Sequence, residues 1–184
     1  DMALKVNDLI YAYLNGFFPM ADSDGDISWY APDPRAIIPI NAYKVSKSLR
    51  PVLNRGQFEI YINRNFTEVM GNCALPRFLD DNTWISEEII NGYSELNNLG
   101  LAHSVEAYEN DVLVGGLYGV SIGGAFFGES MFFKKPNASK VAFHYLIEIL
   151  KQRNFGLLDT QFINDNVLRF GAVEIPQSDY EKLL

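Results

Sequence analysis

Two polar residues close an apolar run near the end of the chain. Phe155, Leu157 and Leu158 precede Asp159, and Gln161 follows two positions later. Because side chains alternate along an extended segment, Asp159 and Gln161 leave the same face at the end of a predicted strand. Ligands of sheet proteins collect at such ends, where polar groups need partners. The pair therefore marks a candidate site, although a capped carboxylate and a hydrogen-bonded amide also fit the pattern.

A third polar residue, Glu129, interrupts another apolar run. By strand alternation it shares a face with Phe127, Met131 and Phe133. Such a setting raises the pKa of a carboxyl group unless a cation or a hydrogen-bond donor meets it. We expect Glu129 to be either a pocket residue or a glutamate at the rim of the sheet.

The remaining reactive residue types are few. Cys73 is the single cysteine and forms no intramolecular disulfide, and two histidines, His103 and His144, are too few for a zinc set. We interpret Cys73 as a buried thiol and the histidines as satisfied or exposed. No metal site is expected.

The glycine-rich stretches match no cofactor motif. The pairs at 115–116 and 123–124 fit neither a dinucleotide fingerprint nor a phosphate-binding loop. The segment 134–140, before a predicted helix, has no glycine, and Pro136 lacks a backbone donor, so coenzyme A fits poorly there. We expect no cofactor.

Charge limits the partners of the chain. The net charge is −8 over 184 residues, which disfavours general nucleic-acid binding, so any RNA contact must be local. The basic residues gather in two groups, which either meet RNA phosphates or form solvated surface: Lys44, Lys47, Arg50, Arg55 and Arg64, and then Lys134, Lys135 and Lys140. No apolar run is long enough to span a bilayer and no signal peptide is evident, so we expect a cytoplasmic protein.

Hydrophobic periodicity predicts a mixed α+β fold. We expect helices over residues 6–15, 46–54, 65–74, 86–97 and 137–153, and strands over 58–62, 103–108, 112–120, 124–133, 155–159 and 172–175. Asn65, Ser86 and Asn137 are the expected helix N-caps. The prolines around Asp33 predict a domain boundary. The order of helices and strands resembles the GNAT N-acyltransferase fold, with a mixed, largely antiparallel sheet and flanking helices.

A series of short motifs spans nearly the whole chain in order. They are Gly16–Met20, Trp29 with Pro32–Arg35, Thr83–Ile85, Ala102–Glu106, Leu113–Gly119, Gly128–Phe132, Asn137–Lys140, Leu158–Gln161 and Phe170–Pro176. Together they resemble the leucyl/phenylalanyl-tRNA–protein transferase family. One tetrapeptide would carry little weight, but the ordered series is highly specific.

The resemblance implies a small N-terminal domain over residues 1–34 packed on a GNAT-like aminoacyltransferase domain over 35–184, with no metal and no coenzyme. It implies that Asp159 and Gln161 are the catalytic acid and amide. It assigns substrate binding and tRNA binding to these positions: Glu129, Trp84, Phe126, Met20, Ser130 and Leu150 for substrate, and Lys47, Arg50 and Arg55 for tRNA. Met20 and Leu150 stand where some members carry Trp and Phe, which leaves the ranking of Leu, Phe and Met open.

The implied reaction moves Leu or Phe, with Met as a third candidate, from aminoacyl-tRNA to the α-amine of an N-terminal Arg or Lys. The modified protein is thereby marked for degradation by the N-end rule. We expect a monomer without membrane contact. The alternative is a non-catalytic module that binds basic N-termini; a coenzyme A acetyltransferase and an aminoacyl-tRNA-dependent ligase acting on a cell-wall peptide are weaker readings.

Overall fold

The computed structural model describes residues 4–75 and 85–184. Its helices and strands follow the chain as α1 (Val6–Leu14), β1 (Phe18–Ala21), β2 (Ile27–Tyr30), β3 (Arg35–Ile37), the 3-10 helix η1 (Ile40–Ala42), α2 (Arg50–Arg55), β4 (Glu59–Ile62), α3 (Phe66–Cys73), α4 (Glu87–Asn98), β5 (Ala102–Glu109), β6 (Val112–Ile122), β7 (Ala125–Phe133), α5 (Ala138–Gln152), β8 (Leu157–Gln161), α6 (Asp165–Arg169), β9 (Val173–Ile175) and α7 (Gln177–Leu183).

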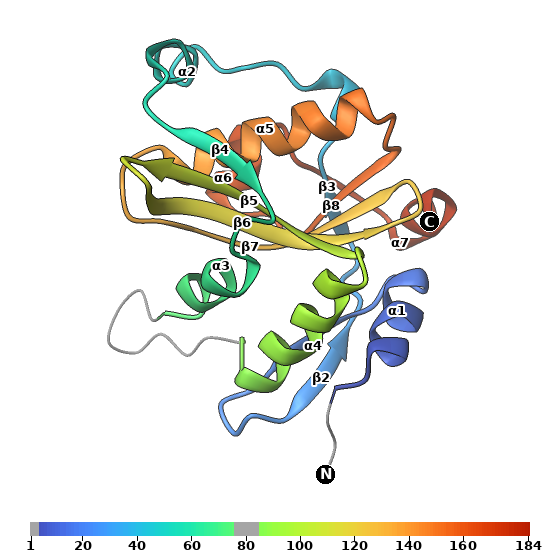
Figure 1. The fold of residues 1–184 in the computed structure, drawn as a ribbon. Coiled ribbons are helices and arrows are strands. Elements are labelled where there is room, and N and C mark those ends of the chain that lie inside the picture. The colour runs from blue at the N-terminus through green and yellow to red at the C-terminus, as the bar shows by residue number, and fades with distance from the viewer. Residues whose placement is uncertain (1–3, 76–84) are drawn as a thin grey trace.

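A seven-stranded sheet crosses the centre of the molecule in the order β4-β5-β6-β7-β8-β3-β9 (Figure 1). β7 and β8 run parallel, and the other neighbours pair antiparallel. β1 and β2 form a separate antiparallel hairpin. The expected α+β class with a mixed, largely antiparallel sheet and flanking helices is confirmed.

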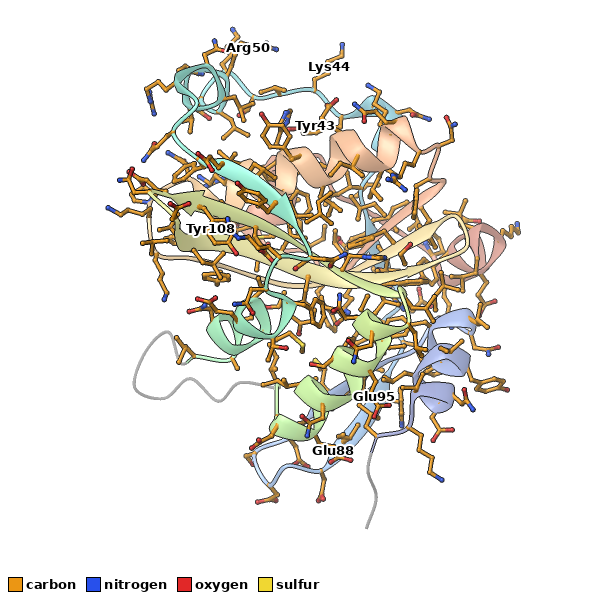
Figure 2. The ribbon with its side chains drawn as sticks, viewed as in Figure 1. Tyr43, Lys44, Arg50, Glu88, Glu95 and Tyr108 are labelled. Atoms are coloured by element: carbon orange, nitrogen blue, oxygen red, sulfur yellow. The ribbon has the colours of Figure 1, made fainter. Side chains whose placement is uncertain are left out.

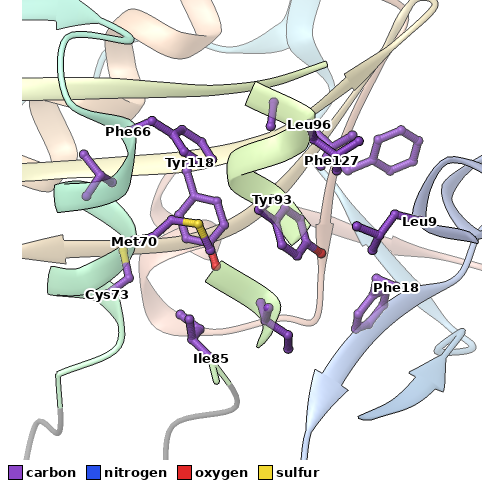
Figure 3. Packing of buried hydrophobic residues seen from close by; sticks show 14 of the residues in the cluster. Leu9, Phe18, Phe66, Met70, Cys73, Ile85, Tyr93, Leu96, Tyr118 and Phe127 are labelled. Atoms are coloured by element: carbon purple, nitrogen blue, oxygen red, sulfur yellow. The ribbon is translucent and has the colours of Figure 1, made fainter. Parts of the chain in front are cut away.

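Helices cover both faces of the sheet, and each face has its own hydrophobic cluster. The first cluster joins the sheet to α1, α3, α4 and α7 and contains many aromatic rings (Figures 1 and 3). The second joins the opposite face to η1, α2, α5 and α6. Because both faces are buried, the central strand β6 is apolar along most of its length rather than alternating.

Local signals explain most helix starts, with two corrections. The side chains of Asn65 and Ser86 accept backbone hydrogen bonds as predicted. Asn137 makes no such bond; it adopts a left-handed backbone conformation with φ +70° before α5, so its predicted capping role is wrong. The helix was predicted over 46–54 but begins only at Arg50. Pro51 lies in its first turn, a position where proline is tolerated because the backbone N–H has no partner within the helix.

Candidate functional site

Asp159 lies on β8 and is fully buried. Its carboxylate accepts hydrogen bonds from Arg35 Nε at 3.1 Å and Arg35 Nη2 at 2.7 Å. It also accepts from the backbone N–H of Gln161 at 2.8 Å and from the Tyr180 hydroxyl at 2.6 Å. Two carboxylate oxygens offer about four acceptor positions in all, so this carboxylate is saturated.

Arg35 connects three distant parts of the chain at this point. It is 2% exposed, and its Nη1 donates to the backbone oxygen of Gly16, just past α1, at 2.7 Å. Its guanidinium also packs over the rings of Phe18 and Tyr180, 4.9 and 4.4 Å from their centroids. A buried ion pair with this many hydrogen bonds fixes the relative positions of α1, β8 and α7.

Gln161 follows in a left-handed backbone conformation, φ +67°, which few residues other than glycine adopt. The hydrogen bond from its N–H to Asp159 supports that conformation. Its side-chain Nε2 then donates to Glu129 Oε2 at 2.9 Å. Gln161 therefore links the saturated carboxylate to a second one.

Glu129 occupies a β-bulge in β7. Tyr118 pairs with Ser130 and Gly119 with Gly128, so Glu129 has no partner opposite it on β6. A bulge re-aims side chains, and here it also breaks the expected alternation: Phe127 packs in the cluster on the α4 side, whereas Met131 packs on the α5 side. The prediction that Phe127, Glu129 and Met131 all share one face is therefore wrong.

The bulge depends on Gly119. A Cβ atom there would lie 2.4 Å from the backbone oxygen of Phe127 and 2.5 Å from the Phe126 ring. Backbone cannot yield to such a contact cheaply, so the close approach of β6 and β7 at the bulge requires glycine.

The Glu129 carboxyl has mainly uncharged partners. Its Oε1 accepts from the Tyr13 hydroxyl on α1, and that hydroxyl also bonds to Tyr93 on α4. Desolvation raises the pKa of Glu129 to about 8, and the charge of Asp159 adds to the rise, while hydrogen bonds from Tyr13 and Gln161 and the charge of Arg35 oppose it. Glu129 thus changes protonation near neutral pH.

A cavity of about 340 Å³ opens beside Gln161 and Glu129. Its polar lining includes Ser130 and Thr160. Its apolar wall comes from β6, β7, α5 and α6 on the α5 side of the sheet: Leu117, Met131, Phe143, Leu146 and Val167. Apolar cavities of this size with a few convergent polar groups are typical ligand sites. One wall suits an apolar side chain, and the polar side suits a group with hydrogen-bond donors.

Within residues 4–75 and 85–184, no group of three or more His, Cys, Asp or Glu residues is arranged to hold a metal ion. His103 and His144 are satisfied as expected, since the Nδ1 of His103 lies 2.8 Å from Asn63 Nδ2 and that of His144 lies 2.7 Å from the Tyr43 hydroxyl. No helix in the described part of the chain is long and apolar enough to cross a bilayer.

Comparison with known proteins decides the family. Residues 37–184 match the family described as leucyl/phenylalanyl-tRNA protein transferase, and residues 2–33 match its N-terminal domain. The chain belongs to the leucyl/phenylalanyl-tRNA–protein transferase family. This is a family of aminoacyltransferases.

Curated relatives carry the family name. The leucyl/phenylalanyl-tRNA–protein transferase of Chlorobaculum parvum is 52% identical over 178 residues, which are 96% of this chain and 92% of that protein. The protein of the same name from Prosthecochloris aestuarii is 50% identical over 182 residues, 98% and 94% of the two chains. Among solved structures, that of L-PGS from Bacillus licheniformis matches with a TM-score of 0.49 and 13% identity over 96% of this chain and 60% of that one, too distant to support an argument.

The residues expected from the family resemblance to form the substrate pocket are divided between two cavities. Met20 and Ser130 line the cavity together with Glu129 and Gln161. Phe126 and Leu150 are buried deeper and line an adjoining cavity of about 250 Å³, with Leu146 common to both. Trp84 lies outside the described residues.

The basic residues that the transferase family assigns to tRNA lie on the α5 side of the sheet. Lys47 precedes α2, and Arg50 and Arg55 are its first and last residues; all three are exposed. Figure 2 shows Arg50 and Lys44 at this side and Glu88 and Glu95 of α4 at the other. Lys44 and Arg50 therefore lie on the opposite side of the sheet from Glu88 and Glu95.

Sequence reasoning missed the residues that hold the site together, namely Arg35, Tyr180, Tyr13 and Tyr93. One signal for Arg35 was available: a buried acid at the end of an apolar strand needs a cation, and Arg35 heads another apolar segment, Ala36 to Ile38. Nothing comparable marks the tyrosines. They come from three helices, and only tertiary structure brings them together.

Proposed function

We propose that this protein transfers Leu or Phe, with Met as a third candidate, from aminoacyl-tRNA to the α-amine of an N-terminal Arg or Lys. The acceptor protein is thereby marked for degradation by the N-end rule. The observation that carries the proposal is the apolar cavity whose polar side is formed by Gln161 and Glu129, in a chain of this family.

The reaction needs positioning more than activation. The aminoacyl ester is already reactive, so holding the amine against its carbonyl supplies much of the acceleration. The hydrogen bond from Gln161 Nε2 to Glu129 orients the amide group, and its side-chain oxygen then accepts a hydrogen bond from the incoming amine. Asp159 acts through Gln161 by supporting its backbone conformation.

Proton transfer does not use Asp159 in this scheme, because its oxygens are occupied. The amine attacks the ester carbonyl, the C–N bond forms and the C–O bond to the ribose breaks. The amine loses a proton, and the released ribose hydroxyl gains one. Glu129 binds the cationic N-terminal residue, whose charge favours the ionised carboxylate.

The cavity wall is proposed to receive the side chain of the transferred amino acid. Leu117, Met131, Phe143 and Leu146 offer an apolar surface that suits Leu, Phe and Met alike. Met20 lies at the wall where some family members carry Trp, and a flexible thioether adapts to different shapes.

The wider setting of this function is also proposed. Residues 1–34 form a small N-terminal domain, residues 35–184 form a GNAT-like N-acyltransferase domain, and the enzyme works as a cytoplasmic monomer. Support comes from the separate β1–β2 hairpin and from the order of the elements after β3.

The deciding experiment measures transfer of labelled Leu from charged tRNA to a peptide that starts with Arg, beside the same peptide that starts with Ala. Product on the Arg peptide alone is expected. Binding of the Arg peptide without product would instead favour the non-catalytic module. Asp159→Ala and Gln161→Ala are expected to lose turnover while keeping tRNA affinity, and near-normal turnover in both would contradict their roles.

A further inference from the structure

A second polar cavity, of about 310 Å³, opens on the α5 side of the molecule. Its floor is apolar and buried, formed by Tyr43, Leu49 and Phe170. Its rim is polar and comes from three separate segments: Ser46 and Ser48 before α2, Lys140 in the first turn of α5, and Arg169 at the end of α6. The fold thus brings Lys140, from the second predicted basic group, to the same cavity as Arg169, which belongs to neither group.

The rim is positive because it carries Lys140 and Arg169. No acidic residue lines the cavity, and the salt bridges found between described residues involve neither Lys140 nor Arg169. Lys47 lies between the two serines in sequence, Arg50 follows two residues after the second, and both are exposed. Two unpaired cations beside two hydroxyl groups form a typical environment for a phosphate group.

The charge of Arg50 affects the pKa of His144 on α5, next to this cavity. Burial lowers the pKa of His144, one turn beyond Lys140; Glu148 opposes that shift and the charge of Arg50 adds to it. Glu148 is the acid that acts on this region, and it lies outside the cavity lining. The charge of Arg50 therefore acts on the same helix that carries Lys140.

A contact between Phe143 and Phe170 separates this cavity from the 340 Å³ cavity beside Gln161 and Glu129, which is the proposed aminoacyl cavity. Phe143 lines the aminoacyl cavity and contacts the Phe170 ring, with 4.5 Å between centroids. Phe170 in turn stacks on Tyr43 in the floor of the basic cavity, at 5.9 Å. A nucleic acid whose end enters the first cavity would pass its backbone close to the second.

We propose that this cavity binds a backbone phosphate of the tRNA near its aminoacylated end, through Lys140 and Arg169 with the hydroxyls of Ser46 and Ser48. The proposal rests on the proposed function and adds a tRNA contact beyond α2. It also reconciles the net charge of −8 with RNA binding, because the attraction is confined to a local surface.

The test compares the double variant Lys140→Gln/Arg169→Gln with the wild-type chain. A matched control, Lys5→Gln/Lys151→Gln, makes the same charge change at exposed positions away from the cavity. The first measurement is the affinity for uncharged tRNA across a salt series. The second is transfer to an Arg peptide from two donors, phenylalanyl-tRNA and phenylalanyl-adenosine, which has no phosphate.

We expect the double variant to bind tRNA about tenfold more weakly, with the slope of log K against log salt reduced by about one to two. We expect turnover with the adenosine donor, and both properties of the control variant, to remain unchanged. Unchanged tRNA affinity and slope in a folded double variant would overturn the phosphate site, as would an equal loss with both donors. Absence of product from wild-type protein with both donors would refute the proposed function instead, and the binding series would still decide the cavity.

Discussion

The surroundings of Asp159 and Glu129 differ sharply although Gln161 contacts both carboxyl groups. Asp159 faces the Arg35 guanidinium, a tyrosine hydroxyl and a backbone N–H, is fully buried, and lines no described cavity. Glu129 is bonded to uncharged groups and lines the cavity of about 340 Å³ beside Gln161. A carboxylate with a cation and a full set of donors holds geometry, whereas one with mainly neutral partners can change its charge.

The largest expected effect comes from removing the cation on the Asp159 side. Arg35→Ala leaves a buried carboxylate without its countercharge, which typically costs about 3–5 kcal/mol. Denaturant unfolding measures this loss. Arg153→Ala, at an exposed arginine, is the control and should change stability by less than about 0.5 kcal/mol. Equal effects of the two variants would show that the buried pair does not hold the site together.

A smaller loss of stability is expected from removing the Tyr180 hydroxyl, which donates to Asp159. Tyr180→Phe keeps the ring beneath Arg35 but deprives Asp159 of one donor, at a cost of about 1–3 kcal/mol. Because Asp159 supports Gln161, we also expect kcat to fall with KM for aminoacyl-tRNA unchanged. A fall in stability with wild-type kcat would limit Tyr180 to a structural role.

The contribution of Glu129 to the free energy of unfolding should instead depend on pH. Its folded pKa of about 8 exceeds the ordinary value of 4.5, so the folded state binds more protons between these values and stability falls as pH rises through that window. The slope is at most about 1.4 kcal/mol per pH unit. Unfolding of wild type and Glu129→Gln, followed from about pH 5 to about pH 8.5, measures this slope. The variant should lose this component, and parallel curves would refute the raised pKa.

The smallest change in stability is expected from removing the Tyr118 hydroxyl, which is compared with that of Tyr180. The Tyr118 hydroxyl is buried and has no hydrogen-bond partner among the described residues, whereas that of Tyr180 is bonded. Tyr118→Phe removes an unsatisfied polar group and should change stability by less than about 0.5 kcal/mol or increase it slightly. A loss as large as that of Tyr180→Phe would reveal a partner for Tyr118.

Much of the fold was predictable because its signals are local. The meander of β5, β6 and β7 follows from alternation and turns, and α4 from its cap at Ser86 and the spacing of Ile89, Tyr93 and Leu96. The strand β3 was missed because it has three residues and joins the sheet only by inserting between β8 and β9. The short helices α6 and α7 were missed for the same reason: brief segments carry little periodicity.

The sequence by itself determined the fold class, the family and the candidate residues Asp159, Gln161 and Glu129, because residue identity and short-range spacing encode them. Tertiary structure decided what each of those residues can do. The β-bulge turned Glu129 toward Gln161, and Arg35 and Tyr180, each distant in sequence, filled the acceptor positions of Asp159. The charge state and freedom of a carboxyl group depend on its neighbours in space, and local sequence does not specify those neighbours.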